Sequence, residues 1–267
     1  MVRIAVAGAA GRMGSRITAL SREYPELKLT GAFEKKGHDA VGKDIGLVIG
    51  IGEIGIKLQD SLEDIIDNVD VIIDFTTPSS TKENVRLSAK KGRAMVIGTT
   101  GFSRDEMKEI EASIKNIPCV MSSNMSAGVN LLLKVLQNTA KVLGDEYDIE
   151  IIEAHHRMKK DAPSGTAMKM AQLIADAINR NLDEVAVYTR KGLIGERTRK
   201  EIGIQTIRAG DIVGEHTVIF GGLGERIEIT HKASSRDTFA RGALKAAMWV
   251  YGKPAGLYDM QDVLGLK

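Results

Sequence analysis

The first fourteen residues constrain the fold of this chain more than any other stretch. Residues 2–7 read VRIAVA, an apolar strand, and glycines follow at positions 8, 11 and 14 before a helix with an apolar face. A glycine at position 11 lets the backbone approach a ligand, and the start of a helix presents free N–H groups to an anion. The stretch is typical of a dinucleotide-binding turn, although the usual glycine spacing fits only with Ala9 in the first glycine place. A tight turn without a ligand is the alternative.

The remainder of the first half repeats this alternation of strand and helix. Apolar strands are expected at residues 27–33, 69–75, 93–98 and 117–123. Helices are expected between them, one after Pro78 and one capped by Ser103, and Ser61 is expected to start a short helix. Residues 37–60 are rich in glycine without clear periodicity and are expected to be mostly loop. Strands that are apolar on both faces predict an α/β fold with a Rossmann-like, doubly wound parallel sheet.

The second half follows a different pattern. A long helix is expected at 126–143, a strand at 147–154, and a second helix that ends near residue 179. Three segments then alternate polar and apolar residues between short glycine turns, at 203–210, 214–222 and 224–234. This pattern predicts a second, α+β domain with a mixed or antiparallel sheet, whose polar-edged face often packs against another subunit. A final helix at 236–251 has no fixed place from pattern alone.

Composition limits the partners of this chain. It has 267 residues, a formal net charge of +2, and an aromatic content of 4%. A nearly neutral chain that is poor in aromatic side chains offers no broad field or stacking surface for nucleic acid. No stretch approaches the ~18 apolar residues of a membrane span, and Cys119 is the only cysteine. We therefore expect a cytoplasmic protein that binds neither membrane nor nucleic acid.

The second expected strand ends with an acidic residue followed by two lysines. Glu34 stands roughly 20 residues after the glycines, where an acid meets the ribose hydroxyls of a bound dinucleotide. Lys35 and Lys36 add cations that would neutralise a 2′-phosphate, so both NADH and NADPH are expected to bind. A solvated charged turn is the alternative. The loops at 98–101 and 122–125 follow two other strands, at the sheet edge where open α/β folds bind ligands, although either segment could be an ordinary loop.

Residues 153–167, EAHHRMKKDAPSGTA, place two histidines, an arginine and two lysines in one short span of a chain whose formal net charge is only +2. In an extended strand His155 and His156 point to opposite faces, so they should not share one role. Ser164 is expected to cap a helix whose first N–H groups, at Gly165 and Thr166, would grip a carboxylate. A histidine beside lysines loses its proton readily and can act as an acid near neutral pH. The alternatives are a solvated loop, a metal site and a nucleic-acid patch.

Seven motifs together resemble the dihydrodipicolinate reductase (4-hydroxy-tetrahydrodipicolinate reductase) family over nearly the whole chain: VAGAAGRMG, DFTTP, GTTGF, NMSAGVN, EAHHRMKKDAPSGTA, RAGDIVGEHTVIF and ITHKASSRDTFARGA. The resemblance implies reduction of a cyclic, unsaturated dicarboxylate to tetrahydrodipicolinate with NADPH or NADH, in the diaminopimelate route to lysine. It also implies a homotetramer. The dinucleotide-binding domain would comprise residues 1–125 and 236–267, and residues 126–235 would bind the substrate and form the subunit interface.

The resemblance also implies roles for individual residues. His155 would donate the proton and Lys159 would be the second catalytic cation, while His156, Gly165 and Thr166 would contact the substrate carboxylates. The cofactor would be held by Gly8, Ala9, Ala10, Gly11, Arg12, Met13, Glu34, Lys35, Gly98, Thr99, Thr100, Ser122, Ser123, Asn124 and Met125.

Two positions depart from the family pattern. Met158 stands where another histidine is frequent, and Lys35 stands where an arginine is common. A lysine lacks the bidentate phosphate grip and the stacking of an arginine, which weakens a preference for NADP. Two further readings stay open at this point: another Rossmann-type dehydrogenase, and a non-catalytic regulator that senses NAD(P).

Overall fold

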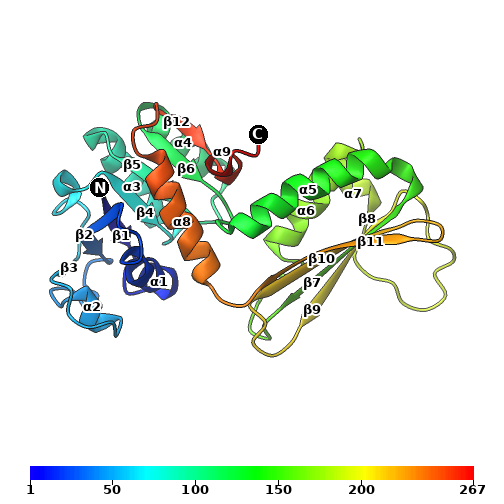
Figure 1. The fold of residues 1–267 in the computed structure, drawn as a ribbon, viewed down its shortest axis with the longest axis horizontal. Helices are drawn as coiled ribbons and strands as arrows, with labels where there is room; N and C mark the ends of the chain where they lie inside the picture. Colours follow the sequence, from blue (N-terminus) through cyan, green and yellow to red (C-terminus); the bar gives the residue numbers. More distant parts are fainter. The chain divides into compact units, whose positions relative to one another are not determined.

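The computed structural model describes residues 1–267, and the chain divides into two units (Figure 1). The first unit combines Met1–Ala127 with Arg236–Lys267, and the second is Gly128–Ser235. The C-terminal helix α8 (Asp237–Val250), which the sequence pattern leaves unplaced, thus belongs to the first unit together with the N-terminal strands.

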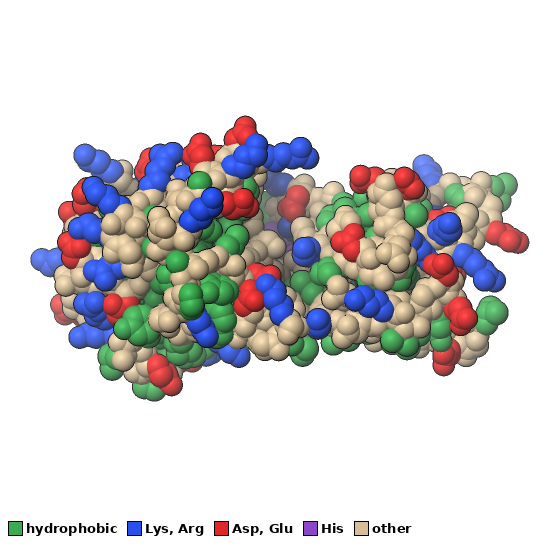
Figure 2. All heavy atoms as spheres, turned by 90° about the horizontal axis from the view of Figure 1, so that it is seen from above, with side chains coloured by type: hydrophobic (Ala, Val, Ile, Leu, Met, Phe, Trp, Pro, Cys, Tyr) green, Lys and Arg blue, Asp and Glu red, His purple; other side chains and the backbone are tan.

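The surface mixes the two signs of charge. On the face shown in Figure 2, Lys and Arg side chains alternate with Asp and Glu side chains over the surface of the protein. The structure contains no helix that is both long and apolar enough to cross a membrane. Cys119 is free and fully buried, and burial raises the pKa of its thiol to about 12. This thiol is therefore a core residue without nucleophilic character.

A seven-stranded, all-parallel sheet forms the centre of the first unit. Its strands, in their order across the sheet, are β12 (Gly256–Tyr258), β6 (Pro118–Met121), β5 (Ala94–Ile97), β4 (Val71–Asp74), β1 (Val2–Ala7), β2 (Leu27–Phe33) and β3 (Leu58–Gln59). Besides α8, its helices are α1 (Arg12–Ser21), α2 (Ile45–Val48), α3 (Pro78–Lys91), α4 (Arg104–Ser113) and α9 (Met260–Leu264), with 3-10 turns at Ile66–Asn68 and Ile114–Asn116. The predicted Rossmann-like fold is confirmed.

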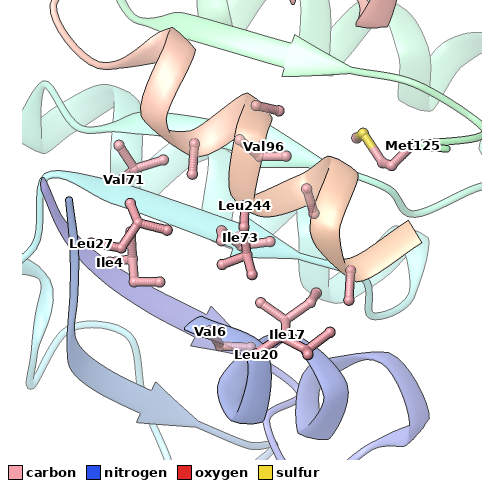
Figure 3. Packing of buried hydrophobic residues seen from close by; sticks show 14 of the residues in the cluster. Ile4, Val6, Ile17, Leu20, Leu27, Val71, Ile73, Val96, Met125 and Leu244 are labelled. Carbon is pink, nitrogen blue, oxygen red and sulfur yellow. The ribbon is translucent and has the colours of Figure 1, made fainter. Parts of the chain in front are cut away.

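Alternate residues of each strand feed two apolar layers, one on each face of this sheet. Ile4, Val71 and Ile73 point toward α1 and α8 and pack against Ile17 and Leu244 (Figure 3). On the other face Ile72, Met95 and Ile97 pack against Val85 of α3 and Ile110 of α4. Because each of these strands is buried on both faces, its sequence is apolar throughout, as a parallel sheet requires.

The glycine turn brings α1 against the end of β1. A Cβ atom at Gly14 would lie 2.1 Å from the carbonyl oxygen of Gly8 and 2.7 Å from Cα of Ala9. Only a residue without a side chain permits this approach, so Gly14 fixes how closely the helix packs on the strand.

The second unit is built on a five-stranded mixed sheet. Its strands, in order, are β11 (Arg226–Ala233), β10 (Gly214–Gly221), β7 (Asp148–His155), β9 (Ile202–Arg208) and β8 (Ala186–Val187). Strand β10 is antiparallel to both of its neighbours, whereas β7, β9 and β8 are parallel to one another. The mixed sheet predicted for this part of the chain is confirmed.

Helices cover one face of this second sheet. Helices α5 (Ala127–Leu143) and α6 (Gly165–Ala177) lie along that face (Figure 1), and α7 (Leu182–Val185) and a 3-10 turn at Gly144–Glu146 complete the unit. Leu136 of α5 and Ile174 of α6 pack on Ile151, Val218 and Phe220 of the sheet. The opposite face of the sheet carries no helix of this unit (Figure 1).

One local expectation was confirmed and one was wrong. Residues 37–60 are mostly loop, as expected, but they also contain the short elements α2 and β3, which are organised by the Asp44 carboxylate. That carboxylate caps α2 and also accepts hydrogen bonds from the backbone N–H groups of Ile54 and Ile56. The Ser61 side chain accepts from Glu63 N, but the helical turn that follows is a 3-10 turn at Ile66–Asn68. The capping box predicted at Ser103 is confirmed.

Replacing Gly14 by alanine tests the close approach of α1 to β1. In an ordinary helix interior the change from glycine to alanine stabilises by about 1 kcal/mol. Here we expect a loss of about 1–3 kcal/mol, because the new methyl group has to displace backbone atoms. Urea unfolding of the full chain, followed by circular dichroism, measures the change. Ser15→Ala on the same helix is the control and should stay within about 0.5 kcal/mol. A Gly14→Ala protein as stable as the parent would contradict this packing.

Candidate active site

The strand order of the parallel sheet reverses between β1 and β4, which places a crevice at their carboxyl ends. A cavity of about 530 Å³ opens there, and its lining includes Gly8, Gly11, Glu34, Lys35 and Thr76. Four of these five residues were predicted from the sequence to hold the cofactor, and the structure places them around one space.

The glycine turn has the backbone shape that a bound pyrophosphate needs. Gly8 has φ +62°, a left-handed conformation that side chains rarely adopt, and a Cβ at Gly11 would lie 3.0 Å from the Gly8 carbonyl oxygen. Gly11 is the N-cap of α1, and no side chain caps this helix. The first turn of α1 therefore offers N–H groups and the positive end of its dipole to an anion.

Glu34 closes the crevice from the end of β2. Its Oε1 atom accepts a hydrogen bond from Ala10 N at 3.1 Å, and its Oε2 atom accepts from Lys35 N at 3.3 Å. The carboxylate thus lies across the glycine turn, where it can accept hydrogen bonds from ribose hydroxyls. Lys35 and Lys36 supply the only cations of the cavity lining, whose other charged members besides Glu34 are Asp60, Glu63 and Glu83.

Asp74, at the end of β4, organises this edge of the sheet and was missed by sequence reasoning. Its side chain is fully buried and accepts hydrogen bonds from Thr76 N at 3.0 Å and Thr76 Oγ1 at 2.6 Å. Thr81, Thr99 and Asn84 donate to the same carboxyl group, at 3.2, 3.3 and 2.8 Å. One acidic group therefore ties the loop after β4, the helix α3 and the loop after β5 together.

The other predicted cofactor residues lie at the same edge but differ in exposure. Thr100, Ser123 and Arg12 are exposed, whereas Met13, Gly98, Ser122 and Asn124 are half-buried. Ala9 and Met125 are buried in the core, with exposed fractions of 0% and 1%, so that only their backbone can face a ligand. Gly98 lies against the Phe75 ring, since a Cβ there would come within 2.1 Å of that ring. The Ser122 hydroxyl donates to Asn124 O at 2.8 Å and shapes the loop after β6.

In the second unit, strand β7 ends with His155, which the sequence singled out as the proton donor. Its Nδ1 atom lies 2.6 Å from Oε2 of Glu153, a carboxylate two residues earlier on the same face of the strand. The Glu153 side chain is fully buried, and Arg208 of β9 binds both of its oxygens at 2.8 Å. The Nε2 edge of the ring lies beside Gly214, where a Cβ would be 3.1 Å away.

The loop after β7 carries the second predicted catalytic cation. Lys159 Nζ lies 2.8 and 2.9 Å from the two carboxylate oxygens of Asp161, and its side chain is 20% exposed. Lys159 N also donates to the His156 carbonyl oxygen, so the loop turns at His156. His156 itself is half-buried.

Helix α6 begins where this loop ends. Ser164 is its N-cap, as predicted, and accepts a hydrogen bond from Ala167 N at 3.1 Å. No heavy atom outside the immediate chain lies within 4 Å of where a Gly165 side chain would be, and Thr166 is half-buried. The start of α6 is therefore open toward a ligand at Gly165, and its dipole favours a carboxylate there.

The pKa values of Glu153, His155 and His216 are all lowered, for different physical reasons. Burial alone would raise the pKa of Glu153, but hydrogen bonds from Arg208, His155 and Ser164 N outweigh it and lower that pKa to about 2. Burial lowers the pKa of His155, Glu153 partly opposes this, and the charges of Lys159 and Arg208 lower it further. Burial and the charge of His155 lower the pKa of His216 to about 4. His155 is thus the histidine of this pair poised to exchange a proton.

Sequence reasoning also missed Glu153, Arg208 and His216. His216 Nε2 lies 3.0 Å from Ser164 Oγ, and its ring meets the His155 ring edge-on at 5.2 Å between centroids. The spacing of Glu153 and His155, two residues apart on one strand, could have revealed that pair. Arg208 could not have been found in this way, since its position opposite His155 depends on the pairing of β7 with β9.

Together these features define a Rossmann-like nucleotide-binding protein with a second, α+β unit that carries a histidine and an anion-binding helix start. Comparison with known proteins narrows this class. The family model for "Dihydrodipicolinate reductase, N-terminus" matches residues 2–125, and that for "Dihydrodipicolinate reductase, C-terminus" matches residues 128–264. The chain belongs to the dihydrodipicolinate reductase family, which confirms the resemblance found in the sequence.

Curated relatives match over the full length. A 4-hydroxy-tetrahydrodipicolinate reductase from Syntrophobacter fumaroxidans is 58% identical over 267 residues, and one from Syntrophus aciditrophicus is 57% identical, each alignment covering 100% of both chains. Among solved structures, a dipicolinate-bound dihydrodipicolinate reductase from a Paenisporosarcina species has a TM-score of 0.75 at 24% identity, covering 98% of each chain. That structural likeness supports the fold.

The two lysines at the end of β2 provide a test of cofactor choice. We expect the double variant Lys35→Ala, Lys36→Ala to lose affinity for NADPH more than for NADH, because only NADPH carries the 2′-phosphate that these cations would neutralise. A hydrogen bond to a charged group contributes about 1.5–3 kcal/mol, and about 1.4 kcal/mol is tenfold in affinity, so we expect a loss of at least about 10-fold for NADPH alone. The dissociation constant of each cofactor is measured by titrating it into the protein and following the intrinsic protein fluorescence. Equal losses for both cofactors would contradict a role in phosphate recognition.

Proposed function

We propose that this protein reduces 4-hydroxy-tetrahydrodipicolinate (dihydrodipicolinate) to tetrahydrodipicolinate with NADH or NADPH, in the diaminopimelate route to lysine. Family membership and full-length relatives of that name support the proposal. The observation that carries it is the placement of His155 on a buried carboxylate, in a unit that also holds Lys159 and the open start of α6. The two carboxylates of the substrate need anion-binding groups, and protonation of its ring needs an acid.

The first unit would hold the cofactor. The pyrophosphate would lie on the N-terminus of α1 at Gly11 and the adenosine ribose beside Glu34, while the residues that follow β5 and β6 would line the nicotinamide end. A bound nicotinamide supplies the hydride of the reaction. The open turn at Gly8 and Gly11, which side chains would block, fits such a group.

The second unit would hold the substrate. One carboxylate would accept hydrogen bonds from the N–H groups at Gly165 and Thr166, and the other would face the side chains of His156 and Lys159. Lys159 is paired with Asp161 here, so a substrate carboxylate has to compete with Asp161 for it. Hydride transfer requires the reacting atoms of cofactor and substrate to lie about 3–3.5 Å apart with water excluded.

His155 would supply the proton. When the ring carries the 4-hydroxyl group, that group first leaves as water. Reduction then adds one hydride and one proton across an unsaturated bond of the dehydrated ring, and His155 gives up the proton and is left neutral. The same imidazole is then reprotonated from solvent. Because burial and neighbouring cations lower the pKa of His155, its charged form is a stronger acid than an ordinary histidine.

We further propose that the protein is a cytoplasmic homotetramer whose interface uses the uncovered face of the second sheet. That face carries Ile152, Ile207 and Ile219, and Ile207 is 47% exposed in the single chain. A sheet face that carries apolar side chains among polar ones, and that no helix covers, can be buried against a second copy of itself. The free thiol of Cys119 and the use of a nicotinamide cofactor support a reducing compartment.

His155→Gln tests the proton donor. We expect the turnover number to fall about 10²–10⁴-fold, the usual contribution of a general acid, with a modest change in KM. Loss of NADPH absorbance, with substrate generated in place by the synthase, measures both. Unchanged NADPH affinity in a fluorescence titration serves as the control for folding. If the parent protein fails to reduce this substrate, the proposed function is wrong; if the variant keeps most of its turnover, His155 is not the donor.

Ile207→Lys tests the subunit interface. In an isolated chain a lysine at this exposed position should change stability by less than about 0.5 kcal/mol, but in an interface it buries an unpaired charge. We therefore expect the variant to dissociate. Ile227→Lys is the matched control, because Ile227 is 40% exposed and pairs with Phe220 on the helix-covered face. Sedimentation velocity measures the mass. A parent protein that sediments as a monomer would overturn this part of the proposal.

A further inference from the structure

The buried carboxylate of Glu153 has five polar contacts. Its Oε2 atom contacts His155 Nδ1 and Arg208 Nη1, at 2.6 and 2.8 Å. Its Oε1 atom accepts from Arg208 Nη2 at 2.8 Å, Ser164 N at 3.0 Å and Thr206 Oγ1 at 3.1 Å. A carboxylate has about four lone-pair positions, so these five contacts satisfy both oxygens.

We propose that Glu153, held by Arg208, is a positioning residue that fixes the tautomer and orientation of His155, so that Nε2 is the nitrogen that exchanges the proton. The argument rests on the chemistry of the two groups. An ionised carboxylate can only accept a hydrogen bond, so the nitrogen that it contacts must carry hydrogen in both protonation states of the imidazole. Neutral His155 then has its hydrogen on Nδ1 and a bare Nε2. This inference rests on the proposed function for its catalytic meaning, but the tautomer itself can be observed without any reaction.

Arg208 keeps Glu153 in the ionised form that this role requires. The guanidinium makes a two-point contact with the carboxylate, and its Nη2 atom also donates to the Asp161 carbonyl oxygen at 2.6 Å. A buried carboxylate without such a partner would bind a proton and could then donate to the imidazole. With Arg208 in place, the pKa of Glu153 lies at about 2, well below any physiological pH.

The charged groups around His155 show why the carboxylate matters for proton supply. Glu153 lies on its own strand, Arg208 on β9, Lys159 and Asp161 on the following loop, and His216 on β10. Burial and the positive charges disfavour the imidazolium, and Glu153 is the group that favours it. Removing the carboxylate charge therefore lowers the pKa of His155 and reduces the fraction that carries a proton near neutral pH.

The same carboxylate also links the proton donor to the start of α6. Ser164 donates its backbone N–H to Glu153, while its hydroxyl accepts from Ala167 N and contacts His216 Nε2. His155 and the N-terminus of α6 are therefore positioned by one buried group. A substrate held at that helix start meets an imidazole whose orientation is already set.

Glu153→Gln tests this role, with Glu150→Gln as the matched control. The glutamine keeps an oxygen that can accept from Ser164 N, but it removes the negative charge. Glu150 lies on the same strand, pointing to the other face, and is held by Arg190 at 2.8 and 2.9 Å and by Arg197 at 3.1 Å. Nitrogen NMR of isotope-labelled histidine reports the tautomer and pKa of His155, with the resonances assigned by their loss in His155→Gln.

In the parent protein we expect neutral His155 to be protonated on Nδ1. In Glu153→Gln we expect a mixed tautomer and a His155 pKa lower by about one unit or more, whereas Glu150→Gln should match the parent. The turnover number should fall about 10²-fold. Because the protonated form is active, activity is lost as pH rises through the pKa, and this limb of the kcat profile should move to lower pH. Glu153→Asp, which keeps the charge, should restore part of the activity.

Two results would overturn the inference. A parent protein whose neutral His155 is protonated mainly on Nε2 contradicts it directly, and this measurement needs no variant to fold. A Glu153→Gln protein that loses activity while the tautomer and pKa of His155 stay unchanged would give Glu153 a structural role only. If the parent protein shows the Nδ1 tautomer but no reductase activity, the positioning stands and the proposed function fails.

Discussion

A buried carboxyl group needs hydrogen-bond donors from the protein in place of water, and this requirement shapes both units of the protein. Asp74 and Glu153 are each fully buried at or near the carboxyl end of a strand. Their donors come from segments that are distant in sequence, such as Thr99 for Asp74 and Arg208 for Glu153. Each acid therefore fixes the loops around it, and those loops carry the residues of the candidate sites.

Asp74 and Glu153 accept hydrogen bonds from different kinds of donor. The difference follows from the groups that each acid positions, which are loops for Asp74 and an imidazole for Glu153. Asp74 is surrounded by threonine hydroxyls, an amide and a backbone N–H, which are neutral and keep the cofactor loops in one shape. Glu153 is bound by a guanidinium and an imidazole. An imidazole that changes charge during a reaction needs a partner whose own charge is constant. Arg208 keeps the Glu153 carboxylate ionised and so makes it such a partner.

Sequence reasoning reached the features that depend on neighbouring residues and missed those that depend on strand pairing. The glycine turn, the Ser103 and Ser164 caps and the two kinds of sheet follow from local pattern and were predicted. The Glu153–Arg208 pair joins residues 55 apart in the chain, and no local pattern specifies that β9 lies beside β7. The two short elements within 37–60 were not predicted for a related reason, since Asp44 bonds to Ile56 across a loop.

The low pKa of His155 in the free protein has a consequence for the proposed reaction. Burial lowers the pKa of His155, and the charges of Lys159 and Arg208 lower it further against the opposing effect of Glu153. A substrate with two carboxylates brings negative charge to the same place, and opposite charges within about 4–6 Å favour the protonated form of an imidazole. Binding of the substrate would therefore raise the pKa of His155 and favour the protonated imidazole that the reaction needs. Departure of the product would lower that pKa again. Lys159 would thus serve the proton donor as well as a substrate carboxylate, because its lowering of the pKa of His155 is offset when an anion binds.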